Sequence, residues 1–258
     1  MKKGKIITIS IVSVVLVLLI VLTCTLFNLK TVDIEYLAQA TNTNSVRKEE
    51  IFKSAQFKMG TNLLFTSYSK NVANIEKQCP AIKVMKVVKK FPNKITVYIV
   101  EREKQIRILG NDGYYYIFDE DLKVLHITAT ESEYENYCEV KGYELKEELR
   151  EGDFLKDKTF KNKMSAILDG IYSSGRTPTS IMSSIVVSKI NGVDSYMFTF
   201  KSGAKMKVDG SNKLEDKLFI GINAYNNESQ KRTAEQLSEF KIWVTTKGQC
   251  NIDVEEDW

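Results

Sequence analysis

The chain has 258 residues, with 37 Lys and Arg against 33 Asp and Glu, which gives a formal net charge of +4. This near balance argues against a nucleic-acid-binding protein, because such domains carry a strong basic excess. Four scattered cysteines without a CxxC pair, and one histidine, argue against a zinc site and a disulfide framework, although one optional cysteine pair stays open.

Residues 6–29 form an uncharged, apolar run behind Lys2, Lys3 and Lys5. A helix of this length spans ~36 Å, which exceeds the ~30 Å core of a bilayer. Lysines before such a run favour a cytoplasmic N-terminus. Since a signal peptide has an apolar core of roughly 7–15 residues, we predict an uncleaved transmembrane helix here, rather than a cleaved leader or a lipoprotein modified at Cys24.

The short tail before this run carries most of the net charge. Three of the 37 basic residues lie in the tail, so 37 − 3 = 34 basic residues remain outside it. Together with the 33 acidic residues they give the rest of the chain a net charge of +1. The region outside the predicted helix is therefore nearly neutral, and nucleic acid is not an expected partner.

A strand and a short helix are predicted next. Thr31 to Ala40 alternates apolar and polar residues, which is typical of a strand. The polar turn TNTNS follows, and Ser45 is a suitable N-cap for a helix whose apolar side holds Ile51, Phe52 and Ala55.

A second helix is predicted after Ser67. Tyr68, Val72, Ile75 and Cys79 recur at spacings of one helical stripe, and Pro80 ends the helix because the residue before a proline avoids the α region.

Two strands are predicted after that proline. The first covers Ile82 to Lys90, Phe91-Pro92-Asn93 forms a turn, and Ile95, Val97 and Ile99 lie on one face of the second. The element order to this point is β-α-α-β-β, which buries one small core beneath two helices.

Basic residues are concentrated on the first of these strands. Strict alternation puts Lys83 and Lys89 on one face and Lys86 and Lys90 on the other. This scatters the charge, so we interpret the lysines as protective or as facing a partner or lipid, rather than as a phosphate-binding stripe.

The second half of the chain is predicted to be rich in strands. GNDG is a turn, and YYYIF and LKVLHIT form a hairpin. A helix is expected from about Asp157 to Ser173 and another from about Lys213 to Tyr225, with three β segments between them. A polar, helical connection at residues 226–239 leads to a last hairpin that turns at Lys247-Gly248.

Motifs for catalysis are missing from the sequence. It contains no GxxxxGK, GxGxxG, HExxH or GxSxG. His126 lies in an alternating strand pattern without a neighbouring nucleophile, and the acidic runs read as solvated surface. We read Asn227-Glu228-Ser229 as a chance match to a glycosylation acceptor. Neither an enzyme nor a cofactor is expected.

Several motifs together resemble the FtsQ/DivIB family of bacterial cell-division proteins. They are VDIEYL, IF, GTNLLF and CPAIKVMKVVKKFPNKITVYIVERE, with Pro80-Ala81-Ile82, Lys90-Phe91-Pro92 and Val100-Glu101-Arg102 at the family's positions. YYYIFDEDLKVL, FKSGAKMKVDGSNKLEDKL and CNIDVEEDW resemble later parts of the family more loosely. Two departures are Leu122, where a glycine is usual in a D-x-x-G turn, and Gln39-Ala40, where a glycine usually follows the first strand.

The resemblance implies an α+β fold: a single transmembrane helix, a POTRA domain (β-α-α-β-β) and a mixed β-rich domain with interspersed helices. On this basis we expect a cytoplasmic tail, a transmembrane helix, a POTRA domain, a β domain and a terminal strand at residues 1–5, 6–29, 30–109, 110–249 and 250–258.

The resemblance also implies a non-enzymatic scaffold at the division septum. The expected partners are FtsL-like and FtsB/DivIC-like single-pass coiled-coil proteins and septal peptidoglycan synthases. A membrane-anchored envelope enzyme or carbohydrate-binding protein, and an envelope chaperone that uses the POTRA module, are the alternatives.

The family binds one partner by strand addition at the end of its β domain, in which an open edge pairs with an incoming strand. The matching positions are Ile252, Asp253 and Val254, with Trp258 as a candidate aromatic anchor. The same segment could instead be only the last core strand. A weaker candidate surface on the POTRA domain or near the membrane is formed by Lys83, Lys86, Lys89 and Arg102.

Overall fold

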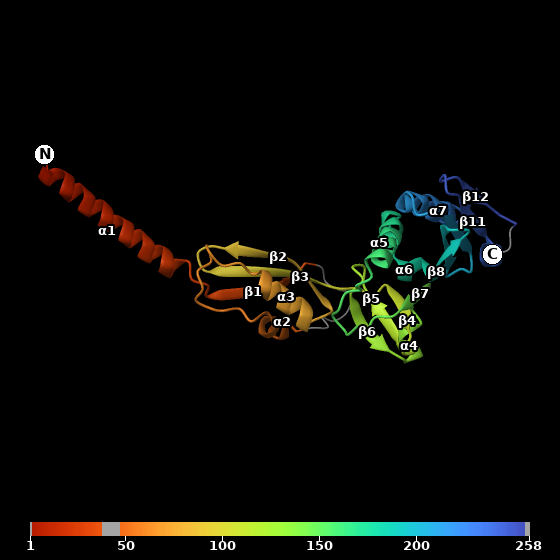
Figure 1. Cartoon of the computed structure of the whole chain (residues 1–258), viewed down its shortest axis with the longest axis horizontal. Helices are drawn as coiled ribbons and strands as arrows, with labels where there is room; N and C mark the ends of the chain where they lie inside the picture. Colours follow the sequence, from red (N-terminus) through yellow and green to blue (C-terminus); the bar gives the residue numbers. More distant parts are fainter. Residues whose placement is uncertain (1, 38–46, 256–258) are drawn as a thin grey trace. The chain divides into compact units, whose positions relative to one another are not determined.

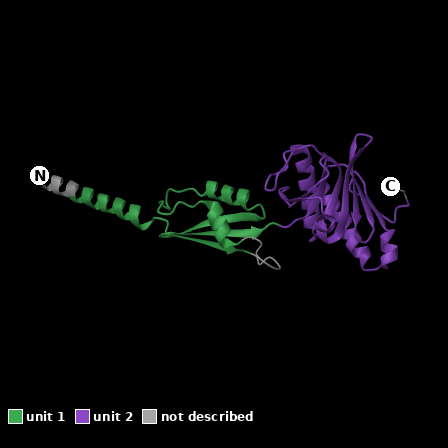
Figure 2. Ribbon diagram, turned by 90° about the horizontal axis from the view of Figure 1, so that it is seen from below, with its two compact units in different colours: residues 1–102 green, residues 103–258 purple. Residues whose placement is uncertain are grey.

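The computed structural model describes residues 2–37 and 47–255, with side chains from residue 11 onward. The chain divides into two compact units, Met1–Arg102 and Glu103–Trp258 (Figure 2). The predicted boundary lay after residue 109. Residues 106–110 instead form a strand that pairs within the second unit.

Unit 1 has the predicted β-α-α-β-β order behind one long N-terminal helix (Figure 1). Its sheet has the order β1-β3-β2, with β1 parallel and β2 antiparallel to the central β3. Its elements are α1 (Lys2–Leu26), β1 (Thr31–Tyr36), α2 (Lys48–Ala55), α3 (Ser69–Gln78), β2 (Ile82–Lys90) and β3 (Lys94–Glu101).

The core of unit 1 lies between one face of this sheet and the helices α2 and α3. Ile95, Val97 and Ile99 of β3 are fully buried and belong to one cluster with Ile51 of α2 and Ile75 of α3. The alternation predicted for β3 and the stripe predicted for α3 are therefore both confirmed at these positions.

A β-bulge corrects the predicted facing of the β2 lysines. The register between β2 and β3 shifts between Val84 and Lys86. Lys83 lies before the bulge and Lys86 after it, so both side chains lie on the open face of the sheet. Lys89 pairs with the core residue Ile95 and lies on the face that the helices cover. Strict alternation was wrong here because a bulge inserts one residue and inverts the facing of everything beyond it.

Unit 2 is built on a nine-stranded sheet of order β12-β11-β10-β9-β8-β7-β4-β5-β6. Its strands are β4 (Ile106–Gly110), β5 (Tyr115–Phe118), β6 (Val124–Thr128), β7 (Cys138–Leu145), β8 (Met182–Ile190), β9 (Val193–Phe200), β10 (Lys205–Asp209), β11 (Lys241–Val244) and β12 (Cys250–Ile252). Its helices are α4 (Glu131–Tyr134), α5 (Lys158–Ser173), α6 (Pro178–Ile181), α7 (Leu214–Ser229) and α8 (Ala234–Ser238).

The predicted helices and the three predicted β segments of unit 2 are present. Asp157 caps α5, since its carboxylate accepts hydrogen bonds from the backbone N–H groups of Thr159 and Phe160. Gly170 of α5 lies against Leu218 of α7, where an added Cβ would come within 2.8 Å of the Leu218 Cβ. Both helices contribute buried residues to the same core as the sheet.

Two strands of unit 2 were not predicted, β4 and β7. They pair in parallel with each other, and β7 pairs in parallel with β8. GNDG therefore joins β4 to β5, and the hairpin formed by β5 and β6 is one strand pair of a larger sheet.

The turn at Leu122 forms although a glycine is usual at this position. It adopts a positive φ of 58° and is fully buried. A left-handed non-glycine residue costs roughly 1–2 kcal/mol, which burial of a leucine side chain, worth about 2 kcal/mol, can offset. The turn that the sequence left in doubt is thus preserved by packing.

The predicted transmembrane helix, residues 6–29, corresponds to α1, which ends at Leu26. Among the described residues no helix has both the length and the hydropathy needed to cross a membrane. The residues expected to cap α2 and to follow β1, Ser45 and Gln39-Ala40, lie outside the described residues. All four cysteine thiols are free, so the optional disulfide is not formed.

Candidate functional site

The strand β12 forms one edge of the nine-stranded sheet (Figure 1). It pairs antiparallel with β11, with Ile252 opposite Ile242 and Cys250 opposite Val244. No strand among the described residues pairs with its other side. An edge strand of this kind presents backbone groups to which a further strand can bind.

The pairing pattern shows which backbone groups of β12 face outward. The Thr245 N–H donates a hydrogen bond to the Gln249 carbonyl oxygen at 2.9 Å. Residues that face each other across an antiparallel pair alternate between hydrogen-bonded and non-hydrogen-bonded arrangements. Cys250 and Ile252 therefore direct their N–H and C=O groups away from β11, whereas Asn251 directs its groups toward it.

An ionic contact ends this edge directly after Ile252. Asp253 adopts a positive φ of 54°, and its carboxylate accepts a hydrogen bond from Arg232 at 2.6 Å. Arg232 also donates to Glu228 at 3.1 Å and lies 4.4 Å from the centroid of the Phe240 ring. Hydrogen bonds lower the pKa of Glu228, with the larger contribution from Lys231 and the smaller from Arg232. This cluster fixes the chain where β12 stops.

The predicted partner residues are thus only partly in the strand. Ile252 lies in β12 and is 47% exposed, while Asp253 and Val254 follow its end. Trp258 lies outside the described residues. The Cys250 thiol has a pKa raised by burial, so it is protonated at neutral pH and is not a reactive group.

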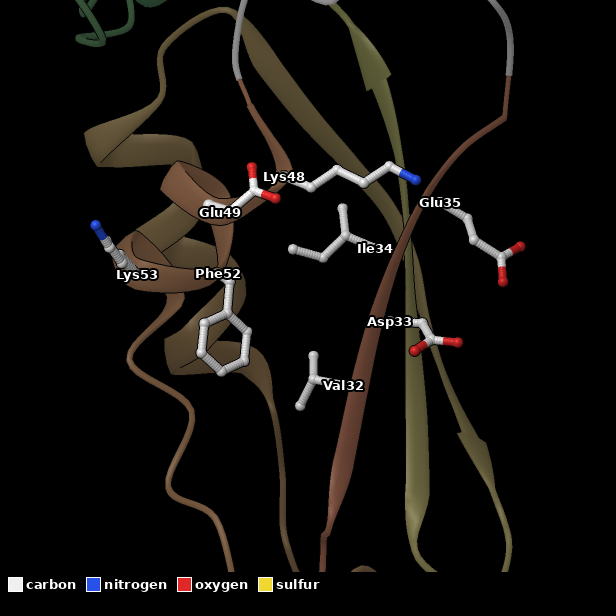
Figure 3. Close-up of a pocket in the computed structure, with 8 residues that line it drawn as sticks. All are labelled: Val32, Asp33, Ile34, Glu35, Lys48, Glu49, Phe52 and Lys53. Atoms are coloured by element: carbon white, nitrogen blue, oxygen red, sulfur yellow. The ribbon is translucent and has the colours of Figure 1, made fainter.

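The sheet of unit 1 has β1 and β2 as its edge strands, and no sequence pattern indicated the surroundings of β1 (Figure 3). A cavity of about 600 Å³ lies between β1 and α2. Val32, Ile34 and Phe52 point into the space between these elements, whereas Asp33 and Glu35 point to the opposite face of the strand. The edge is therefore bordered by an apolar groove, and only the packing of α2 beside β1 creates it.

The predicted lysine surface is divided in the structure. On the open face of the sheet, the Lys86 ammonium lies 4.8 Å from the centroid of the Tyr98 ring. The Lys89 ammonium lies 5.9 Å from the Tyr68 ring. These lysines contact aromatic rings of their own unit and do not form one stripe.

Arg102 is not part of that surface, which corrects its predicted place. It is only 9% exposed, and its Nε donates to the Ile82 carbonyl oxygen at 3.3 Å. Its guanidinium also lies 3.7 Å from the Glu76 carboxylate. Arg102 thus joins the end of β3 to β2 and α3, which gives the Val-Glu-Arg motif a structural role.

His126 lies in β6 between two carboxylates. Its Nδ1 is 2.9 Å from Glu151 and its Nε2 is 3.2 Å from Glu133. Hydrogen bonds lower the pKa of Glu133, with the larger contribution from Thr128 and the smaller from His126. Within residues 11–37 and 47–255 no group of three side chains is arranged to hold a metal ion.

Comparison with known proteins connects this architecture to cell-division proteins. Residues 27–102 match the family model for the FtsQ-type POTRA domain. Cell division protein DivIB of Clostridium botulinum strain Hall is 26% identical over 209 residues, which cover 80% of this chain and 75% of that protein. DivIB of strain Loch Maree is 23% identical over 218 residues, with the same two shares. DivIB of Clostridium tetani is 25% identical over 166 residues, 60% of this chain and 58% of that protein. The matched POTRA domain and these relatives confirm the resemblance found in the sequence: residues 27–102 form an FtsQ-type POTRA domain, and the chain is similar to the DivIB cell-division proteins.

Proposed function

We propose that this chain is a non-enzymatic scaffold of the bacterial division machinery, as the names of its DivIB relatives suggest. The observation that carries the proposal is the open edge of β12, with outward backbone groups at Cys250 and Ile252. A partner strand binds there by continuing the sheet, and its side chains meet the exposed Ile252.

The proposed partners are FtsL-like and FtsB/DivIC-like single-pass proteins, together with septal peptidoglycan synthases. A short strand in such a partner is enough, because β12 itself has only three residues. Backbone pairing supplies affinity, and the groups that flank the edge supply specificity. Arg232 and Asp253, which contact each other beside the edge, are the charged groups that a partner meets first.

The proposed location is the cell membrane at the septum, with a cytoplasmic N-terminus and with the POTRA and β domains outside. The uncharged run of residues 6–29 and the lysines before it support this topology. From Ile11 to Leu22 and at Leu26, the large apolar side chains of α1 are exposed, which suits a lipid environment.

Two experiments test the proposal. A fluorescent fusion of the full chain should gather at the septum of dividing cells, and an even distribution around the envelope would contradict the division role. Deletion of residues 250–258 should abolish pull-down of a DivIC-like partner. Because β12 contributes only the partly buried Cys250 to the core, circular dichroism should show that the truncated chain is folded. Unchanged pull-down by that folded chain would refute this edge as the site.

A further inference from the structure

Four large apolar side chains are exposed in the part of unit 1 that follows α1. Phe65 is 83% exposed and Phe91 is 56% exposed, and Met59 and Leu64, in the same connection as Phe65, are also exposed. We call these four residues the apolar tips. Phe91 belongs to the β2–β3 turn, and the other three lie between α2 and α3. Such a gathering of exposed apolar groups on a small domain marks an interaction surface.

The apolar tips are fixed next to the end of α1. The Asn62 amide donates to the Thr23 carbonyl oxygen at 3.0 Å, and the Leu63 N–H donates to the Phe27 carbonyl oxygen at 2.8 Å. The Phe27 and Phe91 rings meet edge to face, with centroids 5.6 Å apart. The loop that carries Phe65 is therefore bound to Thr23 of α1, and both segments that carry the tips contact Phe27, which directly follows α1.

Beside the tips lies a cavity whose lining combines polar groups with the apolar Val72 and Val87. This cavity of about 680 Å³ borders Leu64 and Phe65, and Thr66, Ser67 and Ser69 also line it. Its lining further includes Lys89 and Tyr68; the Tyr68 hydroxyl is buried and has no hydrogen-bond partner among the described residues. Apolar tips next to hydroxyl and ammonium groups reproduce the change from acyl chains to headgroups at a membrane surface.

We propose that the apolar tips enter the interfacial layer of the membrane that holds α1. Phe65 and Phe91 would lie at the boundary of headgroups and acyl chains, while Lys89 and the hydroxyl groups of the cavity meet phosphate groups of lipids. Unit 1 then rests on the bilayer through two turns in addition to its helix. This inference depends on the membrane anchoring proposed above, since the tips adjoin α1.

Lipid is favoured over a protein partner for the tips because their apolar surface continues that of α1. Leu26 of α1 is 45% exposed, and the hydrogen bonds of Thr23 and Phe27 connect the helix to the loop that carries Phe65. A surface that is continuous with the apolar side of a membrane helix meets the same solvent as that helix.

The test uses the full chain in vesicles of phosphatidylcholine and phosphatidylglycerol whose acyl chains carry bromine, which quenches tryptophan at contact. Trp243 and Trp258 are replaced by phenylalanine, and one reporter is introduced at a time. Phe65→Trp reports on the tips and Leu16→Trp reports on α1. Leu37→Trp is the matched control, because Leu37 is 50% exposed in the same unit and follows the opposite end of β1.

We expect the reporters at 65 and 16 to lose most of their fluorescence and the reporter at 37 to lose none. Quenching at 16 without quenching at 65 would overturn this inference and leave the anchor intact, and the tips would then be free for a protein partner. Quenching at neither position would overturn the anchor as well. Because Phe65 is almost fully exposed, its replacement by tryptophan should not disturb folding.

Discussion

The β1 edge of unit 1 and the β12 edge of unit 2 differ in length, in pairing and in what lies beside them. In unit 1, β1 has six residues, is parallel to its neighbour and borders an apolar groove. In unit 2, β12 has three residues, is antiparallel to its neighbour and ends at the contact between Arg232 and Asp253. Natural proteins keep edge strands short and charged to avoid unwanted pairing.

The difference teaches that an open edge alone does not define a partner site. At β12 the outward groups are limited to two residues and lie beside the contact between Arg232 and Asp253, so a strand added there would be short. At β1, by contrast, an added strand would first have to place its side chains in the groove between β1 and α2. The proposed partner site is therefore β12, and perturbing each unit separately tests this proposal.

The largest effect is expected at Gly142, in the central part of the unit 2 sheet. It has a φ of +78°, and an added Cβ would lie 2.0 Å from the Val187 carbonyl oxygen. Gly142→Ala should lower the free energy of unfolding of unit 2 by about 4 kcal/mol, because backbone strain and overpacking add. Urea unfolding followed by tryptophan fluorescence measures it, since both tryptophans lie in unit 2.

The matched control is Gly175→Ala. Gly175 has a similar φ of +73°, but nothing lies within 4 Å of the added Cβ. Only the backbone term applies, so the loss should be about 1 kcal/mol. Equal losses of unfolding free energy in the two variants would show that the close approach of β7 and β8 at Gly142 does not contribute to the stability of unit 2.

A separate loss is expected for unit 1. Ile75 is fully buried in the core of that unit, which forms its own cluster. Ile75→Ala should cost about 3 kcal/mol, and Ile75→Val about 1 kcal/mol. Hydrogen exchange of β3 peptides should rise in Ile75→Ala while exchange of β9 peptides stays unchanged. A parallel rise in β9 would mean that the two units unfold together.

A smaller effect that depends on pH is expected at Lys163. Its ammonium donates to Asp194 at 2.7 Å, and this bond, followed by one from Ser211, lowers the Asp194 pKa. A carboxyl group with a lowered folded pKa stabilises the fold above its ordinary value of 3.8 and loses that contribution as pH falls through the folded value.

Lys163→Met should therefore cost about 1 kcal/mol at neutral pH, and the difference from the wild type should shrink as the solution is made more acidic than that ordinary value. Urea midpoints measured at a series of pH values test this. A difference that stays constant across the acidic range would show that Asp194 does not need Lys163.

The smallest effect is expected in the β1 groove. Phe52 is 40% exposed, so Phe52→Ser should cost at most about 1 kcal/mol of stability. Pull-down of a DivIC-like partner should be unchanged, because the groove is not the assigned site. Lost binding by a folded Phe52→Ser chain would move the partner site to unit 1.

Local signals in the sequence were sufficient for much of unit 1 and for several helices. As predicted, β2 begins at Ile82, after Pro80, and ends at Lys90, before the Phe91-Pro92-Asn93 turn. The helix expected from about Asp157 to Ser173 is α5, Lys158–Ser173, with Asp157 as its N-cap. Residues of this kind act on their own neighbours, so a single sequence contains the information.

Long-range features could not be foreseen in the same way. The parallel pairing of β4 with β7 joins segments that a turn, a hairpin and a short helix separate. The bulge after Val84 has no proline or glycine to mark it, yet it decides which lysines share a face. The outward direction of the Ile252 amide follows only from the register of β12 on β11.

The most direct test of the central claim compares Ile252→Pro with Ile252→Val. Proline removes the outward N–H of Ile252 and leaves the Asn251 groups that pair with β11, so the chain stays folded. Valine keeps the N–H and the branched side chain. Binding of a DivIC-like extracytoplasmic segment to the full chain should weaken roughly tenfold or more in Ile252→Pro and stay unchanged in Ile252→Val. Equal affinity of the proline variant and the wild type would contradict strand addition at β12.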